Sequence, residues 1–213
     1  MMYRKSVVAA VAALSLGFGT MCTATFAQDA ANPTGKQIPD KNPSDADLQQ
    51  KEAMQEKMKQ DLTSNFNDAD FVTVASLANQ AEIDAAKAAL AKTTNDDVKN
   101  FAQHMIDDHT AAGAELKALA DGKGWQVSDR SDIKHMLALK EMNKMNGPDF
   151  DKAYSSQQVA DHQDAVALFK LAADKASDAD LKAFASKEVP TFETHLKMAQ
   201  DLENKVSSVT LAK

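Results

Sequence analysis

Cysteine, glycine and aromatic residues are scarce in this sequence, and their scarcity argues against several classes of protein. The 213 residues contain one cysteine, seven glycines and 6% aromatic residues. No glycine-rich phosphate loop, nucleophile elbow or H-E-x-x-H helix occurs in the chain. The usual motifs of nucleotide-binding enzymes, hydrolases and metalloproteases are therefore missing. Their absence favours a protein that is not an enzyme and leaves the question open.

Basic residues are too few to suggest a partner that carries phosphate groups. The chain has 24 lysines and arginines against 31 aspartates and glutamates, a formal net charge of -7. An acidic surface repels nucleic acid and lacks the polybasic patch that binds anionic lipids. Long apolar runs are also absent, since the longest has about a dozen residues where roughly 20 are needed to span a bilayer. We predict no nucleic-acid partner and no transmembrane anchor. A peripheral association with the envelope and the oligomeric state stay open.

The short apolar run near the N-terminus has the features of a secretion signal. Arg4 and Lys5 precede it, and small residues that include Thr25 and Ala27 follow it. A basic start, an apolar middle and a small-residue cleavage site are typical of a signal peptide, which we predict over residues 1–27. Cleavage after Ala27 also removes Cys22, so the mature protein has no thiol and no disulfide. The chain is expected to be exported to the periplasm or cell envelope.

The remaining residues divide into a spacer, one helical domain and a short tail. Residues 28–43 contain three prolines and few side chains that could be buried, so we predict a disordered linker over 28–65. Within it, Ser44 can cap a short helix that extends to about Leu62. The domain is predicted over 66–206 and the tail over 207–213.

Helix-forming residues dominate the predicted domain, and no alternating strand pattern occurs. Helices are expected at about 68–92, 96–121, 148–175 and 178–205, with a shorter one inside the connection 123–147. The short connections join the first two and the last two long helices into antiparallel hairpins. One long crossover between two hairpins is typical of the ferritin-like four-helix bundle. The predicted fold is therefore all-α and ferritin-like.

The two hairpins resemble each other in sequence. The string DVKNFA begins at Asp97, and DLKAFA begins at Asp180. In addition, Phe71 precedes Glu82 by the same eleven residues that separate Phe150 from Asp161. These two matches occur in the same order, which predicts a duplicated helical hairpin.

Ionisable residues interrupt the apolar face of each of the four long helices near its middle. They are Glu82, His109, Asp161 with His162 on its flank, and Glu188 with His195. A buried carboxylate costs several kcal/mol unless it is compensated, and total stability is only about 5–15 kcal/mol. The groups must therefore contact one another or a cation.

Two interpretations satisfy this requirement. In the first, the six residues are ligands of a transition metal, and Asp108 supports one of these ligands without binding the metal itself. A set of imidazole and carboxylate ligands suits Fe, Zn, Mn or Cu. In the second, the same groups form a metal-free network of hydrogen bonds. His104 and His135 are expected on the surface. The sequence thus predicts either a metal-binding or redox-protective envelope protein, or a non-catalytic structural and interaction module.

Three long strings carry a family resemblance. FAQHMIDDHTAAGAELKALADGKG, NGPDFDKAYSSQQVADHQDAVALFKLAA and DLKAFASKEVPTFETHLKMAQDL resemble the bacterial domain-of-unknown-function family 4142 over about residues 66–203. The resemblance implies an exported, ferritin-like protein, of a family whose members are often labelled outer membrane proteins and whose activity is not established. The family pattern falls on Glu82, Asp108, His109, Phe150, Asp151, Tyr154, Asp161, His162, Pro190 and His195.

The sequence departs from the di-iron relatives of such a bundle. Those proteins use a Glu-x-x-His pair on two of their helices, and no Glu-x-x-His occurs here. Met105 stands one turn before His109, where a carboxylate would be needed. A ferroxidase or iron-storage activity is therefore not expected.

Overall fold

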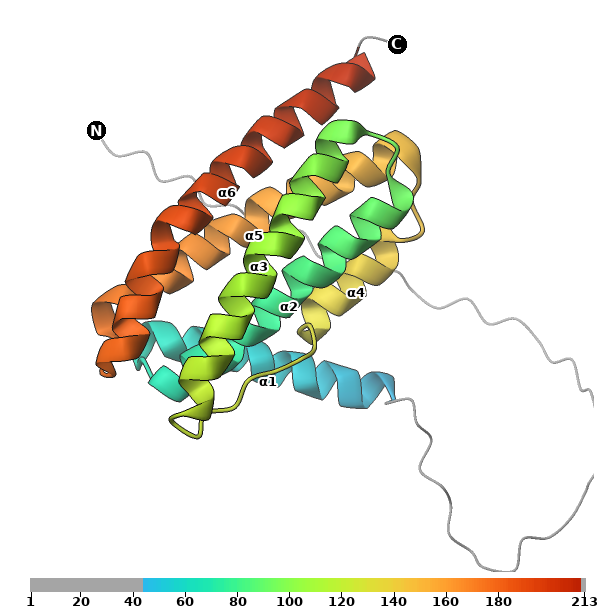
Figure 1. The fold of residues 1–213 in the computed structure, drawn as a ribbon. Coiled ribbons are helices and arrows are strands. Elements are labelled where there is room, and N and C mark those ends of the chain that lie inside the picture. The colour runs from blue at the N-terminus through green and yellow to red at the C-terminus, as the bar shows by residue number, and fades with distance from the viewer. Residues whose placement is uncertain (1–43, 212–213) are drawn as a thin grey trace, which may run out of the picture. The chain divides into compact units, whose positions relative to one another are not determined.

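The computed structural model describes residues 44–211, and the side chains as far as residue 208. The predicted signal peptide and most of the predicted spacer lie outside the described residues. Within the described range the structure is all-α, with no strand (Figure 1). Its helices are α1 (Asp45–Ser64), α2 (Asp68–Lys92), α3 (Asp96–Asp121), α4 (Ile133–Met142), α5 (Gly147–Lys175) and α6 (Ala179–Leu211). None of these helices is both long enough and apolar enough to cross a membrane.

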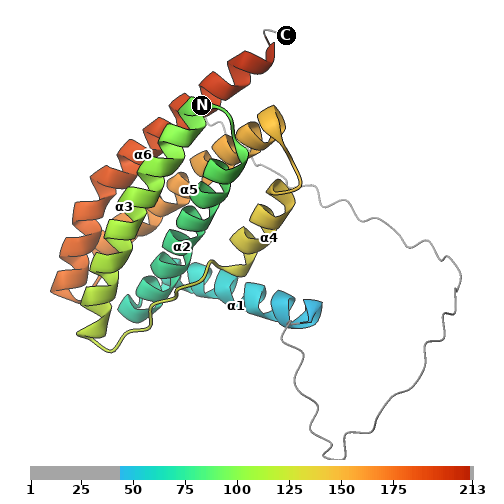
Figure 2. The same ribbon diagram turned by 45° about the vertical axis from the view of Figure 1, so that its right-hand side comes forward.

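The four long helices pack side by side, and each contacts two of the others. α2 contacts α3 and α5, and α6 contacts the same two helices. In both views α2 and α6 run in one direction while α3 and α5 run in the other, so all neighbouring helices are antiparallel (Figures 1 and 2). The segment that contains α4 crosses from the end of α3 to the distant start of α5. This crossover fixes which faces of the two hairpins meet.

Capping side chains set the starts of the helices. The side-chain oxygens of Ser44, Asn67, Asn95 and Asp132 each accept a hydrogen bond from a backbone N–H in the first turn of the following helix. Asp178 does the same for α6. A cap of this type contributes about 1 kcal/mol. The helix starts visible in the sequence are therefore held by local hydrogen bonds.

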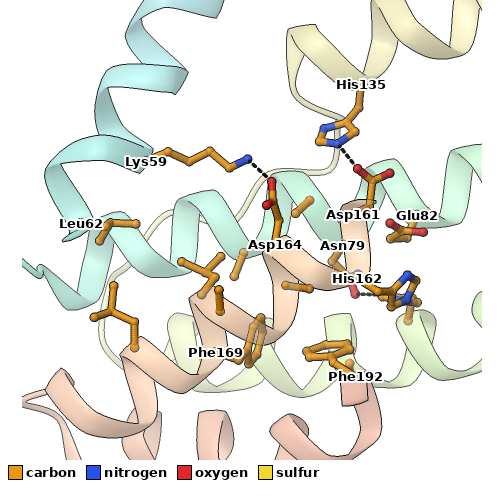
Figure 3. A pocket seen from close by; sticks show the side chains of 18 of the residues that line it. Lys59, Leu62, Asn79, Glu82, His135, Asp161, His162, Asp164, Phe169 and Phe192 are labelled. Atoms are coloured by element: carbon orange, nitrogen blue, oxygen red, sulfur yellow. Dashed lines mark hydrogen bonds and ion pairs between the residues drawn. The ribbon is translucent and has the colours of Figure 1, made fainter. Parts of the chain in front are cut away.

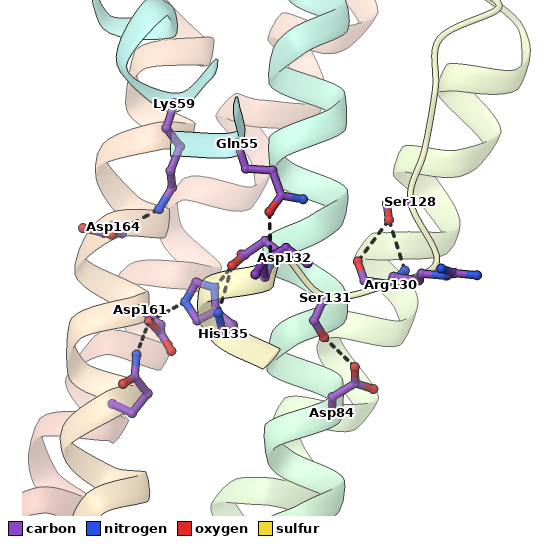
Figure 4. Close-up of polar contacts among 12 residues, drawn as sticks. Gln55, Lys59, Asp84, Ser128, Arg130, Ser131, Asp132, His135, Asp161 and Asp164 are labelled. Atoms are coloured by element: carbon purple, nitrogen blue, oxygen red, sulfur yellow. Dashed lines mark hydrogen bonds and ion pairs between the residues drawn. The ribbon is translucent and has the colours of Figure 1, made fainter. Parts of the chain in front are cut away.

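The helix expected inside the spacer is α1, which lies across α2 and α4 (Figure 2). Among its 20 residues only Leu62 is buried. Polar contacts provide the rest of its attachment: Gln55 Oε1 accepts a hydrogen bond from the backbone N–H of Ile133 at 3.0 Å, and Lys59 pairs with Asp164 at 3.6 Å (Figure 4). α1 is therefore held less firmly than the four long helices.

The hydrophobic core forms two clusters. The first gathers side chains from the first halves of α2 and α6 and the second halves of α3 and α5, among them Phe71, Leu116, Phe169, Leu181, Phe184 and Phe192. The second gathers those from the other halves, among them Phe101, Met105, Phe150, Tyr154 and Leu202. Because neighbouring helices are antiparallel, the clusters lie at opposite ends of the bundle. Glu82, His109, His162 and His195, one from each long helix, are buried between them, at mid-depth.

Candidate metal centre

Three histidines from three helices meet in the polar layer between the two clusters. His109 lies on α3, His162 on α5 and His195 on α6, and their exposed fractions are 3%, 1% and 1%. Their ring centroids are 5.4–5.7 Å apart. One ring nitrogen of each lies within 4.8 Å of one nitrogen of the other two. The structure therefore brings together three of the six predicted ligands, and this buried three-histidine group could hold a metal ion.

Hydrogen bonds define the tautomer of two of these rings. His162 Nδ1 lies 2.9 Å from the backbone oxygen of Gln158, and His195 Nε2 lies 2.9 Å from Oδ2 of Asp108. A carbonyl or carboxylate oxygen only accepts hydrogen bonds, so each of these nitrogens donates its proton. The other nitrogen of each ring must then carry the lone pair.

The third ring is oriented by Asn79 of α2. His109 Nδ1 donates to Asn79 Oδ1 at 3.0 Å (Figure 3). Gly113, one turn after His109 on α3, makes room for this amide, because a Cβ at position 113 would lie only 2.7 Å from Asn79 Nδ2. Hydrogen bonds to the far nitrogen of an imidazole are the usual support of a metal-binding histidine.

The three remaining nitrogens have no hydrogen-bond partner among the described residues. They are Nε2 of His109, Nε2 of His162 and Nδ1 of His195. An unpaired buried acceptor costs about 1–3 kcal/mol, so three of them at one place need a physical explanation. A cation that accepts all three lone pairs would supply it.

Burial also keeps the three rings in the form that binds metals. Removal from water lowers the pKa of His109, and the neighbouring imidazoles of His162 and His195 lower it further. Burial likewise lowers the pKa of His162, and it lowers that of His195 to about 4 despite the hydrogen bond to Asp108. At neutral pH all three are therefore neutral imidazoles, as metal coordination requires.

The spacing of the nitrogens allows an ion to bind after at most a small movement. Atoms within 4.8 Å of one another can all lie within about 2.8 Å of one point, whereas Zn–N bonds are about 2.0–2.1 Å. Each imidazole would have to move inward by less than about 1 Å. Side-chain rotation can supply this movement.

The three predicted carboxylate ligands lie outside the three-histidine group. Glu82 is buried and accepts a hydrogen bond from Gln158 Nε2 at 2.7 Å, and burial, with the negative charge of Asp161, raises its pKa to about 8. Asp161 accepts from His135 Nε2 at 3.0 Å. Glu188 lies 3.5 Å from Lys187 Nζ, and burial raises its pKa. Each carboxylate thus has a protein partner of its own.

Two expectations about orientation were wrong. On α5 it is His162 that lies in the middle of the buried face, whereas the side chain of Asp161 stays 13% exposed at its edge. His135 is not on the surface, because its ring bridges Asp132 and Asp161 and its side chain is only 14% exposed (Figure 4). Although burial opposes the charge, these two carboxylates raise the pKa of His135 to about 10. His104 is half-exposed as expected, and lies 3.3 Å from Asp108.

Sequence reasoning identified one residue that orients a ring, Asp108, which contacts His195, and it missed the other two. Gln158 lies one turn before His162, and Asn79 lies three residues before Glu82 on the inward face of α2. The spacing of one turn was the available signal for Gln158. No comparable signal existed for the pairing of Asn79 with Gly113, because it depends on how α2 and α3 are aligned.

Comparisons with known proteins identify the family. No curated protein matches this sequence. A crystal structure of a DUF305 protein from Streptomyces coelicolor, described as secreted, is similar with a TM-score of 0.57 and 16% identity, over 66% of this chain and 93% of that one. At such low identity the likeness shows a shared fold alone. The model of the family described as "Domain of unknown function (DUF4142)" matches residues 48–202, which include most of α1. The chain therefore belongs to the DUF4142 family.

Proposed function

We propose that this protein is an exported protein of the cell envelope, with a ferritin-like bundle that binds one transition-metal ion through His109, His162 and His195. The observations that support it most strongly are the convergence of three buried imidazole rings from three helices and the unpaired nitrogen that each ring carries. Export is supported by the basic and apolar N-terminal sequence and by the likeness to a protein described as secreted.

The donor set favours some metals over others. Imidazole nitrogen suits zinc, copper and iron, whereas manganese prefers carboxylate and water oxygens. The three carboxylates predicted as ligands lie outside the nitrogen group, which disfavours manganese. Three protein ligands also leave one tetrahedral position open, as in catalytic zinc sites and unlike closed structural sites. Zinc, copper and iron therefore match this centre better than manganese does.

Titration with zinc and, separately, with Cu(I) tests the proposal on protein purified without a histidine tag. About one equivalent is expected to bind, because only one group of three neutral, buried imidazoles is present in the described part of the chain. Calorimetry and elemental analysis after dialysis measure the stoichiometry. The control is His135→Gln, which changes a histidine outside the group. This variant is expected to bind about one equivalent of metal, as the wild type does. The proposal would be rejected if the wild type retained less than about 0.1 equivalent of zinc and also less than about 0.1 equivalent of copper.

Gly113→Ala tests the orientation of His109 without touching a ligand. The new Cβ would displace the Asn79 amide and remove its hydrogen bond to His109 Nδ1. We expect a Kd for zinc that is about 10–100-fold higher, since loss of such a supporting bond has this effect. Gly122→Ala is the matched control, because its Cβ would meet only ordinary contacts. An unchanged Kd in Gly113→Ala would show that Asn79 does not position the ring.

A metal-free polar network is the second candidate, and a specific observation favours it. Asn79, Gln158 and Asp108 already satisfy one nitrogen of each ring. In that case the histidines only fix how the helices align, and the protein is a structural or interaction module. This candidate predicts that histidine substitutions change the melting temperature equally with and without added metal.

A further inference from the structure

A cavity of about 400 Å³ lies beside the three-histidine group, and all six helices contribute residues to its lining. Its lining includes His109 and His162, and a close view shows it reaching from Lys59 to His162 (Figure 3). Sites for small molecules usually have volumes of about 300–1,000 Å³ and are mostly apolar. The cavity is therefore large enough to hold a ligand much larger than a metal ion.

The inner wall of the cavity is mostly apolar. Apolar and aromatic side chains dominate it, among them Leu62, Leu116, Phe169 and Phe192. Phe169 and Phe192 meet edge to face with centroids 4.6 Å apart, and so present a fixed aromatic surface. A charged molecule would lose its hydration here without compensation.

The outer wall is charged but balanced. It contributes three cationic and three anionic side chains: Lys59, Lys134 and His135 against Glu56, Asp161 and Asp164. Two opposite pairs are already formed, between Lys59 and Asp164 at 3.6 Å and between His135 and Asp161 at 3.0 Å (Figure 4). The cavity therefore offers no excess charge to attract an anion or a cation.

We propose that this cavity binds a neutral, largely apolar small molecule, with an aromatic or branched aliphatic body against Phe169 and Phe192 and one uncharged polar end toward Asn79 and Glu82. Figure 3 shows both residues on the side of His162, with Asp161 beside Glu82. α1 covers the cavity through the Lys59–Asp164 pair and the single buried residue Leu62, so the cover can be displaced at small cost. The cavity exists without a metal ion, and this binding goes beyond the function proposed above.

The test uses the mature, metal-free protein and the neutral fluorophore N-phenyl-1-naphthylamine. Saturable binding of one equivalent with a blue-shifted emission is expected. The anionic probe 8-anilino-1-naphthalenesulfonate has a similar shape, and its Kd is expected to be at least about 10-fold higher because its sulfonate would leave water for a cavity whose wall carries no excess positive charge. Absence of saturable binding, or equal affinity for the two probes, would overturn the proposal.

Variants locate the bound probe. Ala112→Phe adds a ring inside the cavity from α3, and the Kd for the neutral probe is expected to rise at least about 10-fold because the space is filled. The matched control is Ala111→Phe, at the adjacent exposed position, which is expected to bind like the wild type. Ala165→Phe fills the cavity from α5 and replaces Ala112→Phe if that variant does not melt cooperatively. Unchanged affinity in a folded filling variant would place the probe elsewhere. Because no metal is present, these results are independent of the metal titration.

Discussion

Zinc at about 1,000 times its Kd is expected to raise the free energy of unfolding of the wild-type protein by about 4 kcal/mol, and that of His162→Leu by almost nothing. A metal that binds only the folded state stabilises it in proportion to the logarithm of its concentration over Kd. The variant loses one of the three histidine ligands, and the group contains no carboxylate that could replace it. Urea unfolding with and without zinc measures the difference.

Without metal, the same variant is expected to be as stable as the wild type or more stable. His162 Nε2 is buried without a hydrogen-bond partner among the described residues, and leucine removes this unpaired group. The backbone oxygen of Gln158 keeps its regular partner in the helix, so nothing new is left unpaired. Gln163→Leu, at the adjacent exposed position, is the control and is expected to keep the full response to zinc. Equal responses of wild type and His162→Leu would instead favour the metal-free network.

The helices and the polar layer could be predicted because local features encode them. Caps such as Asn67 and Asn95 act within one turn, and the residues that fall between the two core clusters show as breaks in the apolar face of each helix. The repeat added the alignment of the two hairpins: Phe71 and Phe150 are both fully buried, one in each cluster. Local periodicity therefore gave the depth of the buried polar groups.

The rotation of α5 could not be predicted with the same certainty. Asp161 and His162 are neighbours, about 100° apart on the helix, and both lie near the apolar face. The choice between them depends on contacts with other helices, such as the ring of Phe101 on α3, 6.4 Å from that of His162. His135 escaped prediction for a related reason. Its partner Asp161 is 26 residues away, and only the docking of α4 on α5 brings the two together.

The buried carboxyl group of Glu82 is expected to make the protein less stable as the pH rises from about 4.5 to about 8. Glu82 ionises near 4.5 in the unfolded chain, but burial and then the charge of Asp161 raise its pKa to about 8 in the folded protein. The protonated carboxyl group therefore contributes fully to stability below its pKa in the unfolded chain. This contribution is lost as the pH rises through its pKa in the folded protein.

Glu82→Gln should remove this pH dependence, because glutamine cannot ionise and its amide oxygen can still accept the hydrogen bond from Gln158. Between pH 4.5 and 8, the free energy of unfolding of the variant should rise relative to that of the wild type by on the order of a few kcal/mol. The rise is about 1.4 kcal/mol per pH unit at most. Urea unfolding of metal-free protein at several pH values measures this gain. The exposed Glu193→Gln exchange on α6 is the control. A gain of the same size in the control would show that the buried position of Glu82 is not its cause.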